Sequence, residues 1–216
     1  MNELLDSIYH LNNIFHTVVG SVGLIGGVIA LAVTKGSDTH KKAGIIFVWL
    51  LGLSAVTSYY PTYYKFGEVG PVAVIMATAT LYLLATALMA IRNQSEIGST
   101  WEKGLVIIPA ILIILPIIRV FIALKTGNYE IFVGPLVLVC LFGYLLITDI
   151  QVLRDRRRDR AYWLNRHMTR MIFAFAFGIM ALVRIGIDFG LTFEMSLVIP
   201  IVAAAILVSF YRRRIP

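Results

Sequence analysis

Apolar residues along this chain fall into seven long runs that are separated by short polar breaks. A helix needs about 20 mostly apolar residues to cross a bilayer, and each run has close to that length. The predicted spans are residues 12–34, 43–62, 70–91, 104–124, 131–150, 168–189 and 195–211. The pattern therefore predicts an all-α fold, a polytopic membrane helix bundle of about seven transmembrane helices.

The breaks between the runs have the chemistry of short loops. Lys35-Gly36-Ser37-Asp38 and Lys125-Thr126-Gly127-Asn128 are typical, because glycine and small polar residues favour turns. No connection is long enough to hold a soluble domain. We therefore expect residues 1–216 to form a single transmembrane domain, with any site inside the bundle or at its rims.

The distribution of lysine and arginine predicts the orientation. Of the 19 basic residues, 15 fall in the first, third and fifth connections and in the C-terminal tail, whereas Lys65 and Lys125 lie on the opposite side. Cytoplasmic loops carry the Lys/Arg excess. The N-terminus is therefore expected outside and the C-terminus in the cytoplasm, in a multi-pass protein of the bacterial cytoplasmic (inner) membrane with the lipid bilayer as its main partner.

Composition supports the membrane interpretation and excludes one alternative. Hydrophobic residues make up 59% of the chain and charged residues 14%, against roughly a quarter charged in ordinary globular proteins. The net charge of +7 is not gathered on a folded basic face but lies between apolar runs, so no nucleic-acid partner is expected. Cys140 is the single cysteine, which rules out an intrachain disulfide.

Charge inside a membrane span is costly and usually functional, and three ionisable residues stand out there: Arg119, Arg184 and Asp188. Arg184 and Asp188 are four residues apart on one helix face and can pair with each other; a purely structural pair at the outer interface is the alternative. Arg119 has no partner within a turn, and Pro116 beside it allows a kink. We expect Arg119 to face the bundle and to meet an acceptor from another helix, with Asp188 as the first candidate, or a water-filled cavity or a bound anion.

Tyrosines gather at the same outer depth, at the end of the second run. Tyr59 and Tyr60 are either part of an interfacial aromatic belt or line an outer ligand pocket together with Arg119, Arg184 and Asp188. Such a pocket would suit a quinone or a small anionic ligand.

The histidines divide by depth. His16 is near the outer end of the first span, whereas His40 and His167 are at cytoplasmic ends. From His16 to Thr34 is 18 residues, roughly 27 Å at about 1.5 Å rise per residue, so a zinc site made of His16, His40 and His167 is disfavoured. His40 and His167 are the best candidates for a shared ligand. His16 also opens a stripe of small residues, Gly20, Gly23 and Gly27, which suits close helix packing or a flat cofactor.

Several motifs resemble those of a bacterial family of multi-span proteins known only as predicted membrane proteins. They are His16-x-x-x-Gly20, Lys35-Gly36-x-x-x-His40-x-x-x-Gly44, Leu81-Tyr82-Leu83, and Trp163-Leu164-x-x-His167-Met168-x-Arg170-Met171. The resemblance covers nearly the whole chain and implies that His16, His40 and His167 belong to recurring motifs, whereas His10 does not. The His-x-x-x-Gly pattern is also weakly similar to transmembrane b-type cytochromes, although those usually show four histidines in two facing pairs.

Three functions remain open on these residues. The first is electron transfer through haem b or a quinone, with His40 and His167 as axial haem ligands and His16 as a further candidate. The second is a transporter or channel for a small molecule or ion, with Arg119, Arg184 and Asp188 as its selectivity element. The third is an intramembrane hydrolase with zinc bound by His40, His167 and Asp149.

Overall fold

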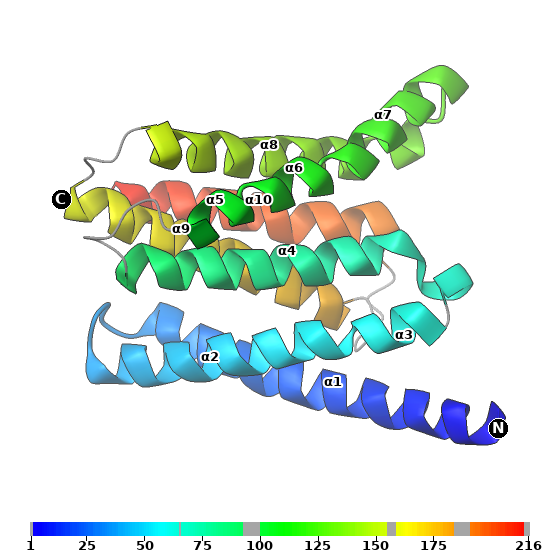
Figure 1. The fold of residues 1–216 in the computed structure, drawn as a ribbon, viewed down its shortest axis with the longest axis horizontal. Coiled ribbons are helices and arrows are strands. Elements are labelled where there is room, and N and C mark those ends of the chain that lie inside the picture. The colour runs from blue at the N-terminus through cyan, green and yellow to red at the C-terminus, as the bar shows by residue number, and fades with distance from the viewer. Residues whose placement is uncertain (1, 65, 93–99, 155–158, 184–190, 214–216) are drawn as a thin grey trace. The chain divides into compact units, whose positions relative to one another are not determined.

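A computed structural model describes residues 2–64, 66–92, 100–154, 159–183 and 191–213 (Figure 1). Within these ranges the elements are helices and no strand occurs. They are α1 (Asn2–Ala32), α2 (Asp38–Thr57), α3 (Tyr59–Tyr64), α4 (Phe66–Arg92), α5 (Thr100–Leu105), α6 (Ile107–Leu112), α7 (Ile114–Thr126), the 3-10 helix η1 (Tyr129–Ile131), α8 (Val133–Arg154), α9 (Arg160–Ala181) and α10 (Phe193–Arg212).

Six helical stretches among the described residues are long and apolar enough to cross a membrane. They are Glu3–Ala32, Asp38–Pro61, Val72–Arg92, Lys103–Thr126, Val133–Arg154 and Glu194–Arg212. The all-helical, multi-pass class that the sequence predicts is therefore confirmed. The largest difference in bounds is at the first span, which begins nine residues earlier than predicted because neither glycine nor proline interrupts residues 2–19.

The sixth predicted span, residues 168–189, corresponds in part to α9, which is not among the six stretches. The first half of α9 carries Arg160, Arg166 and Arg170 and is too polar to resemble a spanning helix. The end of the predicted span lies outside the described residues. A seventh crossing, and the orientation that depends on it, stay predictions.

Large apolar side chains are exposed over much of the helical surface. Trp49 is 73% exposed, Ile206 65% and Ile25 59%, and many other aliphatic residues on α1, α2, α7 and α10 are similarly uncovered. Water-soluble monomers rarely expose apolar surface on this scale. In a bilayer these apolar side chains would contact lipid chains instead of water. The helices would also remain stable there, because they satisfy their own backbone hydrogen bonds.

The chain divides into two compact units. The first unit comprises residues 1–84 and 177–188, and the second comprises residues 85–176 and 189–216. The units are described separately below, and the prediction of a single transmembrane domain stays a prediction.

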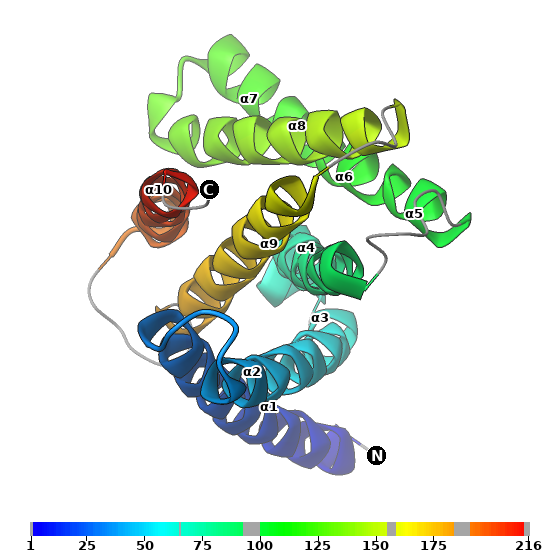
Figure 2. The same ribbon diagram turned by 90° about the vertical axis from the view of Figure 1, so that its left-hand side faces the viewer.

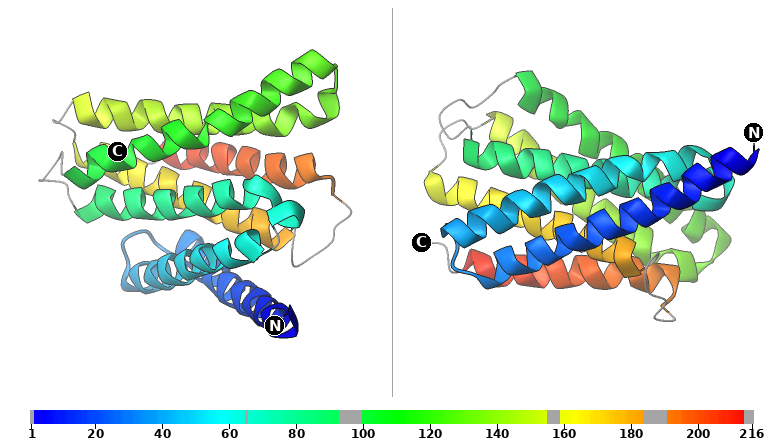
Figure 3. Two further views of the ribbon diagram at one scale, coloured as in Figure 1. Left: turned by 45° about the vertical axis from the view of Figure 1, so that its right-hand side comes forward. Right: turned by 90° about the horizontal axis from the view of Figure 1, so that it is seen from below.

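In the first unit, glycines bring α1 against α2 (Figure 3). A methyl group added to Gly23 would lie 3.0 Å from the backbone nitrogen of Leu51, and one added to Gly26 would lie 3.1 Å from the carbonyl oxygen of Ala43. One added to Gly20 would lie 2.8 Å from the hydroxyl oxygen of Ser54. The small-residue stripe therefore serves helix packing. Gly26 contacts α2 in addition to Gly20 and Gly23, which the sequence predicted.

The turn between α1 and α2 accounts for much of the Lys35–His40 motif. Lys35 Nζ donates to the carbonyl oxygens of Ala30 at 3.0 Å and Leu31 at 2.6 Å, in the last turn of α1, where side chains commonly complete the hydrogen bonding of a helix. Gly36 adopts φ +83°, a conformation that favours glycine. Ser37 caps α2 by accepting the backbone N–H of His40.

In the second unit, prolines divide the fourth predicted span into α5, α6 and α7. The helix is interrupted at Val106 and at Ile113, three residues before Pro109 and Pro116 respectively. Proline has no N–H, so the carbonyl group one turn earlier loses its hydrogen bond and the helix kinks there. The resulting bent segment packs along α8 through α6 and α7 (Figure 2).

Candidate functional site

The candidate site lies in the second unit and is centred on Asp149 of α8. Asp149 is 2% exposed although it belongs to the largely apolar run from Val133 to Leu153. A buried carboxylate needs both a counter-charge and hydrogen-bond donors to remain ionised. Both come from α9, the next helix along the chain.

Arg170 is the first counter-charge and is itself 1% exposed. Its Nη2 donates to Asp149 Oδ1 at 2.6 Å, to Thr148 Oγ1 at 2.9 Å and to the carbonyl oxygen of Leu145 at 3.3 Å. Arg170 therefore has acceptors of three kinds from two turns of α8. This contact joins α8 to α9 where water is excluded.

Arg166 is the second counter-charge. Its Nη2 lies 2.8 Å from the same oxygen, Asp149 Oδ1, and its side chain is 10% exposed. Its other terminal nitrogen, Nη1, is buried and has no hydrogen-bond partner among the residues that the structure describes. One carboxylate oxygen is thus shared between two guanidinium groups, and no described residue accepts a hydrogen bond from Nη1 of Arg166.

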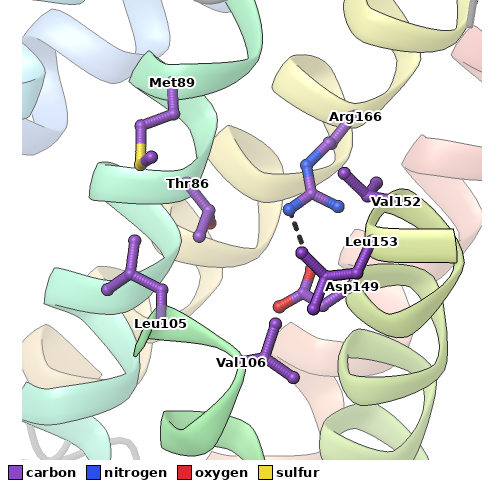
Figure 4. A pocket seen from close by; sticks show the side chains of 8 residues that line it. All are labelled: Thr86, Met89, Leu105, Val106, Asp149, Val152, Leu153 and Arg166. Carbon is purple, nitrogen blue, oxygen red and sulfur yellow. Dashed lines mark ion pairs between the residues drawn. The ribbon is translucent and has the colours of Figure 1, made fainter. Parts of the chain in front are cut away.

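A small cavity adjoins Arg166 (Figure 4). Its lining comes from α4, from the junction of α5 and α6, from α8 and from α9: Thr86, Met89, Leu105, Val106, Asp149, Val152, Leu153 and Arg166. The cavity volume is about 10 Å³, roughly the room that one water molecule needs. The walls are mostly apolar, and the guanidinium of Arg166 and the carboxylate of Asp149 are the charged groups in them.

Other buried polar atoms on α9 also have no partner within the described residues. They are Trp163 Nε1, Asn165 Oδ1 and Thr169 Oγ1. Trp163 is 1% exposed and packs with Ala90 and Val152. Val152 also lines the cavity, so the indole of Trp163 is a near neighbour of the site. Such a concentration of unpaired polar atoms on one helix is unusual for a folded protein.

The three motif histidines share one feature. Each ring nitrogen Nδ1 lies close to a backbone carbonyl oxygen. The distance is 2.8 Å from His16 to Ser54, 3.0 Å from His40 to Ala30, and 2.9 Å from His167 to Ala87. A carbonyl oxygen only accepts, so each Nδ1 carries a proton; in a neutral ring of this tautomer the lone pair is on Nε2. Metal-binding histidines are commonly oriented in this way, and the same contacts tie neighbouring helices together.

His16 also lies beside a second cavity, which is within the first unit. It has a volume of about 30 Å³ and is lined mainly by small and apolar residues, namely Thr17, Gly20, Ser21, Leu24, Leu51, Ser54, Gly178, Ala181 and Leu182 in addition to His16. This space is too small for a haem or a quinone ring as it stands.

The outer pocket predicted from the sequence stays a prediction. Arg184 and Asp188 lie outside the described residues. Arg119 belongs to the second unit, whereas Tyr59 and Tyr60 belong to the first. Arg119 is exposed on α7, and its predicted contact with another helix stays a prediction. Tyr59 donates to or accepts from Thr78 at 2.8 Å, and Tyr60 donates to the carbonyl oxygen of Leu5 at 3.4 Å. Both tyrosines therefore take part in packing within the first unit.

The predicted metal ligands are also distributed differently. His40 belongs to the first unit and His167 to the second, so their shared ligand stays a prediction. Asp149 contacts two arginines. Across the ranges that the structure describes, no group of three or more His, Cys, Asp or Glu side chains is spaced to hold a metal ion.

Arg166 and Arg170 are the functional candidates that sequence reasoning missed, because both count among the basic residues that predict a cytoplasmic loop. The sequence does contain a usable signal. Asp149 is near the end of one predicted span and Arg170 is near the start of the next. The two span ends lie on the same side of the membrane, so these opposite charges are expected at the same depth in the bilayer.

Comparison with known proteins gives no further assignment: no family model, no curated protein and no solved structure matches the chain.

Proposed function

We propose that the chain is a seven-span protein of the bacterial cytoplasmic membrane, with its N-terminus outside and its C-terminus inside. Six apolar helices support a multi-pass protein. The 15 basic residues on one side support the orientation. In this arrangement α9 and the residues after it form a further crossing, and the Asp149–Arg166–Arg170 cluster lies inside the bilayer near its cytoplasmic face.

We propose further that the protein carries a small charged solute across this membrane. The observation that supports this function is the buried Asp149–Arg166–Arg170 cluster beside a water-sized cavity. Ionisable residues within membrane helices are costly and usually mark a path for ions or substrates.

A purely structural role explains Arg170 better than Arg166. Arg170 together with Asp149 is sufficient to join α8 to α9, since it has three acceptors there. Arg166 adds a second buried charge whose Nη1 has no partner. Burying a charge without full compensation costs several kcal/mol, so a helix contact alone gives no reason to keep Arg166.

Ion flux into proteoliposomes tests this proposal. Purified protein is reconstituted, and currents are recorded on a solid-supported membrane after jumps of chloride, nitrate, acetate, phosphate, sodium and potassium. We expect at least one ion to give a current above that of empty liposomes. Arg166→Gln should reduce the current about tenfold, the value of one charge-assisted hydrogen bond.

Arg160→Gln is the matched control, because Arg160 is exposed at the start of the same helix. It should leave the current unchanged. Wild-type protein that conducts none of the six ions, or an Arg166→Gln variant that conducts as well as wild type, contradicts the transport proposal.

A second candidate, haem binding, is favoured by the histidine geometry alone. With Nδ1 held by a backbone carbonyl, His16, His40 and His167 have the tautomer in which Nε2 serves as an iron ligand. Protein purified from haem-supplied cells should then show a Soret band. His40→Ala or His167→Ala should remove it, while His10→Ala should not. A wild-type spectrum without a Soret band, or equal bands in all variants, rejects this candidate.

A further inference from the structure

The guanidinium of Arg166 is held on one side only. Its Nη2 contacts Asp149, while Nη1 is buried without a partner in a side chain that is nine-tenths buried. The same side chain lines the cavity between α4, α8 and α9 (Figure 4). A buried donor of this kind loses its hydration without replacement, unless something else occupies the cavity.

We propose that this cavity binds one oxygen of an anionic oxyacid group, a carboxylate or a phosphate, which accepts a hydrogen bond from Arg166 Nη1. This rests on the proposed transport function and deepens it by naming the class of ligand.

Charge and geometry together define that class. Asp149 Oδ1 is already shared with Arg170, so it offsets the charge of Arg166 incompletely. An anion gains more from such a donor than a neutral acceptor does, because charge-assisted hydrogen bonds are the stronger ones. Arginine often grips an oxyanion with both terminal nitrogens, but here Nη2 is already used. The ligand therefore contributes a single oxygen, which also matches a cavity of about 10 Å³.

The depth of the cavity permits two sources for that oxygen. Asp149 is five residues before the end of α8 at Arg154, and Arg166 is six residues after the start of α9 at Arg160. At about 1.5 Å per residue these positions are about 8–9 Å from the helix ends. Both a free anion entering from the cytoplasm and the phosphate of an anionic lipid reach this depth.

The fluorescence of Trp163 provides a binding signal. Trp163 is buried three residues before Arg166, and it packs on Val152, which lines the cavity. The chain has three tryptophans, so Trp49→Phe and Trp101→Phe leave Trp163 as the single reporter. This protein is placed in nanodiscs of phosphatidylcholine and titrated with acetate and with inorganic phosphate, against sodium chloride of matched ionic strength. A parallel set of nanodiscs contains phosphatidylglycerol.

The expected result is a saturable change in Trp163 emission with acetate or phosphate, or with phosphatidylglycerol, that chloride does not produce. Arg166→Gln in the same background should weaken the apparent affinity by at least about tenfold. Arg166→Lys, which keeps the charge, serves as a second variant, and Arg160→Gln should bind as the parent does. Circular dichroism and gel filtration establish that each variant is folded.

The outcomes separate this inference from the transport function on which it rests. A response to phosphatidylglycerol alone supports the oxyanion site but counts against transport of a free solute. Ion currents without any Trp163 response to acetate, phosphate or lipid overturn the oxyanion site and leave the transport proposal standing. A response that is equal in the parent protein and in folded Arg166→Gln also overturns the site.

Discussion

Arg166 and Arg170 contact the same oxygen of Asp149 from adjacent turns of α9, but their surroundings differ. Arg170 is fully buried and also donates to Thr148 and to the backbone of Leu145. Arg166 is at the edge of a cavity and has a buried nitrogen without a partner. The first arrangement is that of a residue that stabilises the fold, and the second is that of a residue available to a ligand.

This difference predicts unequal costs of folding. Arg170→Gln should lower the free energy of unfolding by about 3–5 kcal/mol, because it breaks a buried ion pair by removing one partner. Arg166→Gln should cost less than about 1.5 kcal/mol, because Asp149 keeps its bond to Arg170. Denaturation by sodium dodecyl sulfate in mixed micelles measures both, with Arg160→Gln as the control. A larger loss from Arg166→Gln than from Arg170→Gln would show that the roles are reversed.

At the scale of elements, long apolar runs predicted the helices well, since a membrane span depends on length and composition that can be read directly. Contacts between helices were harder to predict. The small-residue stripe on α1 was recognised, and Gly26, which was not predicted, joins Gly20 and Gly23 in the contacts with α2. Asp149 was considered only as a metal ligand, because its arginine partners resemble a loop signal until α8 and α9 are placed side by side.

The contact between α1 and α2 predicts opposite results for Gly23 of the small-residue stripe and Gly44 of the motif that begins at Lys35. Gly23→Ala should destabilise the protein by about 1–3 kcal/mol, because its methyl group would meet backbone atoms of α2 at 3.0 Å. Gly44→Ala meets nothing within 4 Å and should be neutral or stabilising by up to about 1 kcal/mol. Thermal unfolding in detergent, followed by gel filtration, compares the two. Greater damage from Gly44→Ala would contradict the packing described here.

At the scale of the whole molecule, the proposed topology and transport function depend on whether α9 is part of a membrane crossing. Seven spans put the two termini on opposite sides and the buried Asp149–Arg166–Arg170 cluster within the bilayer. With six spans, α9 does not cross and the cluster belongs to a helix at the membrane surface. Arg160 would then be solvated, since a surface helix tolerates arginine readily, and Arg166 and Arg170 would pair with Asp149 outside the hydrocarbon core.

Cysteine labelling on either side of α9 decides between these arrangements most directly. In a Cys140→Ala background, Arg160→Cys and Leu191→Cys place single thiols at exposed positions, one at the start of α9 and one after its end. Lys41→Cys and Tyr63→Cys serve as references for the inner and outer sides. Intact cells are treated with a membrane-impermeant maleimide, with and without permeabilisation. We expect Leu191→Cys to be labelled in intact cells, as Tyr63→Cys is. We expect Arg160→Cys to be labelled only after permeabilisation, as Lys41→Cys is. Labelling of Arg160→Cys and Leu191→Cys from the same side would contradict the proposed topology.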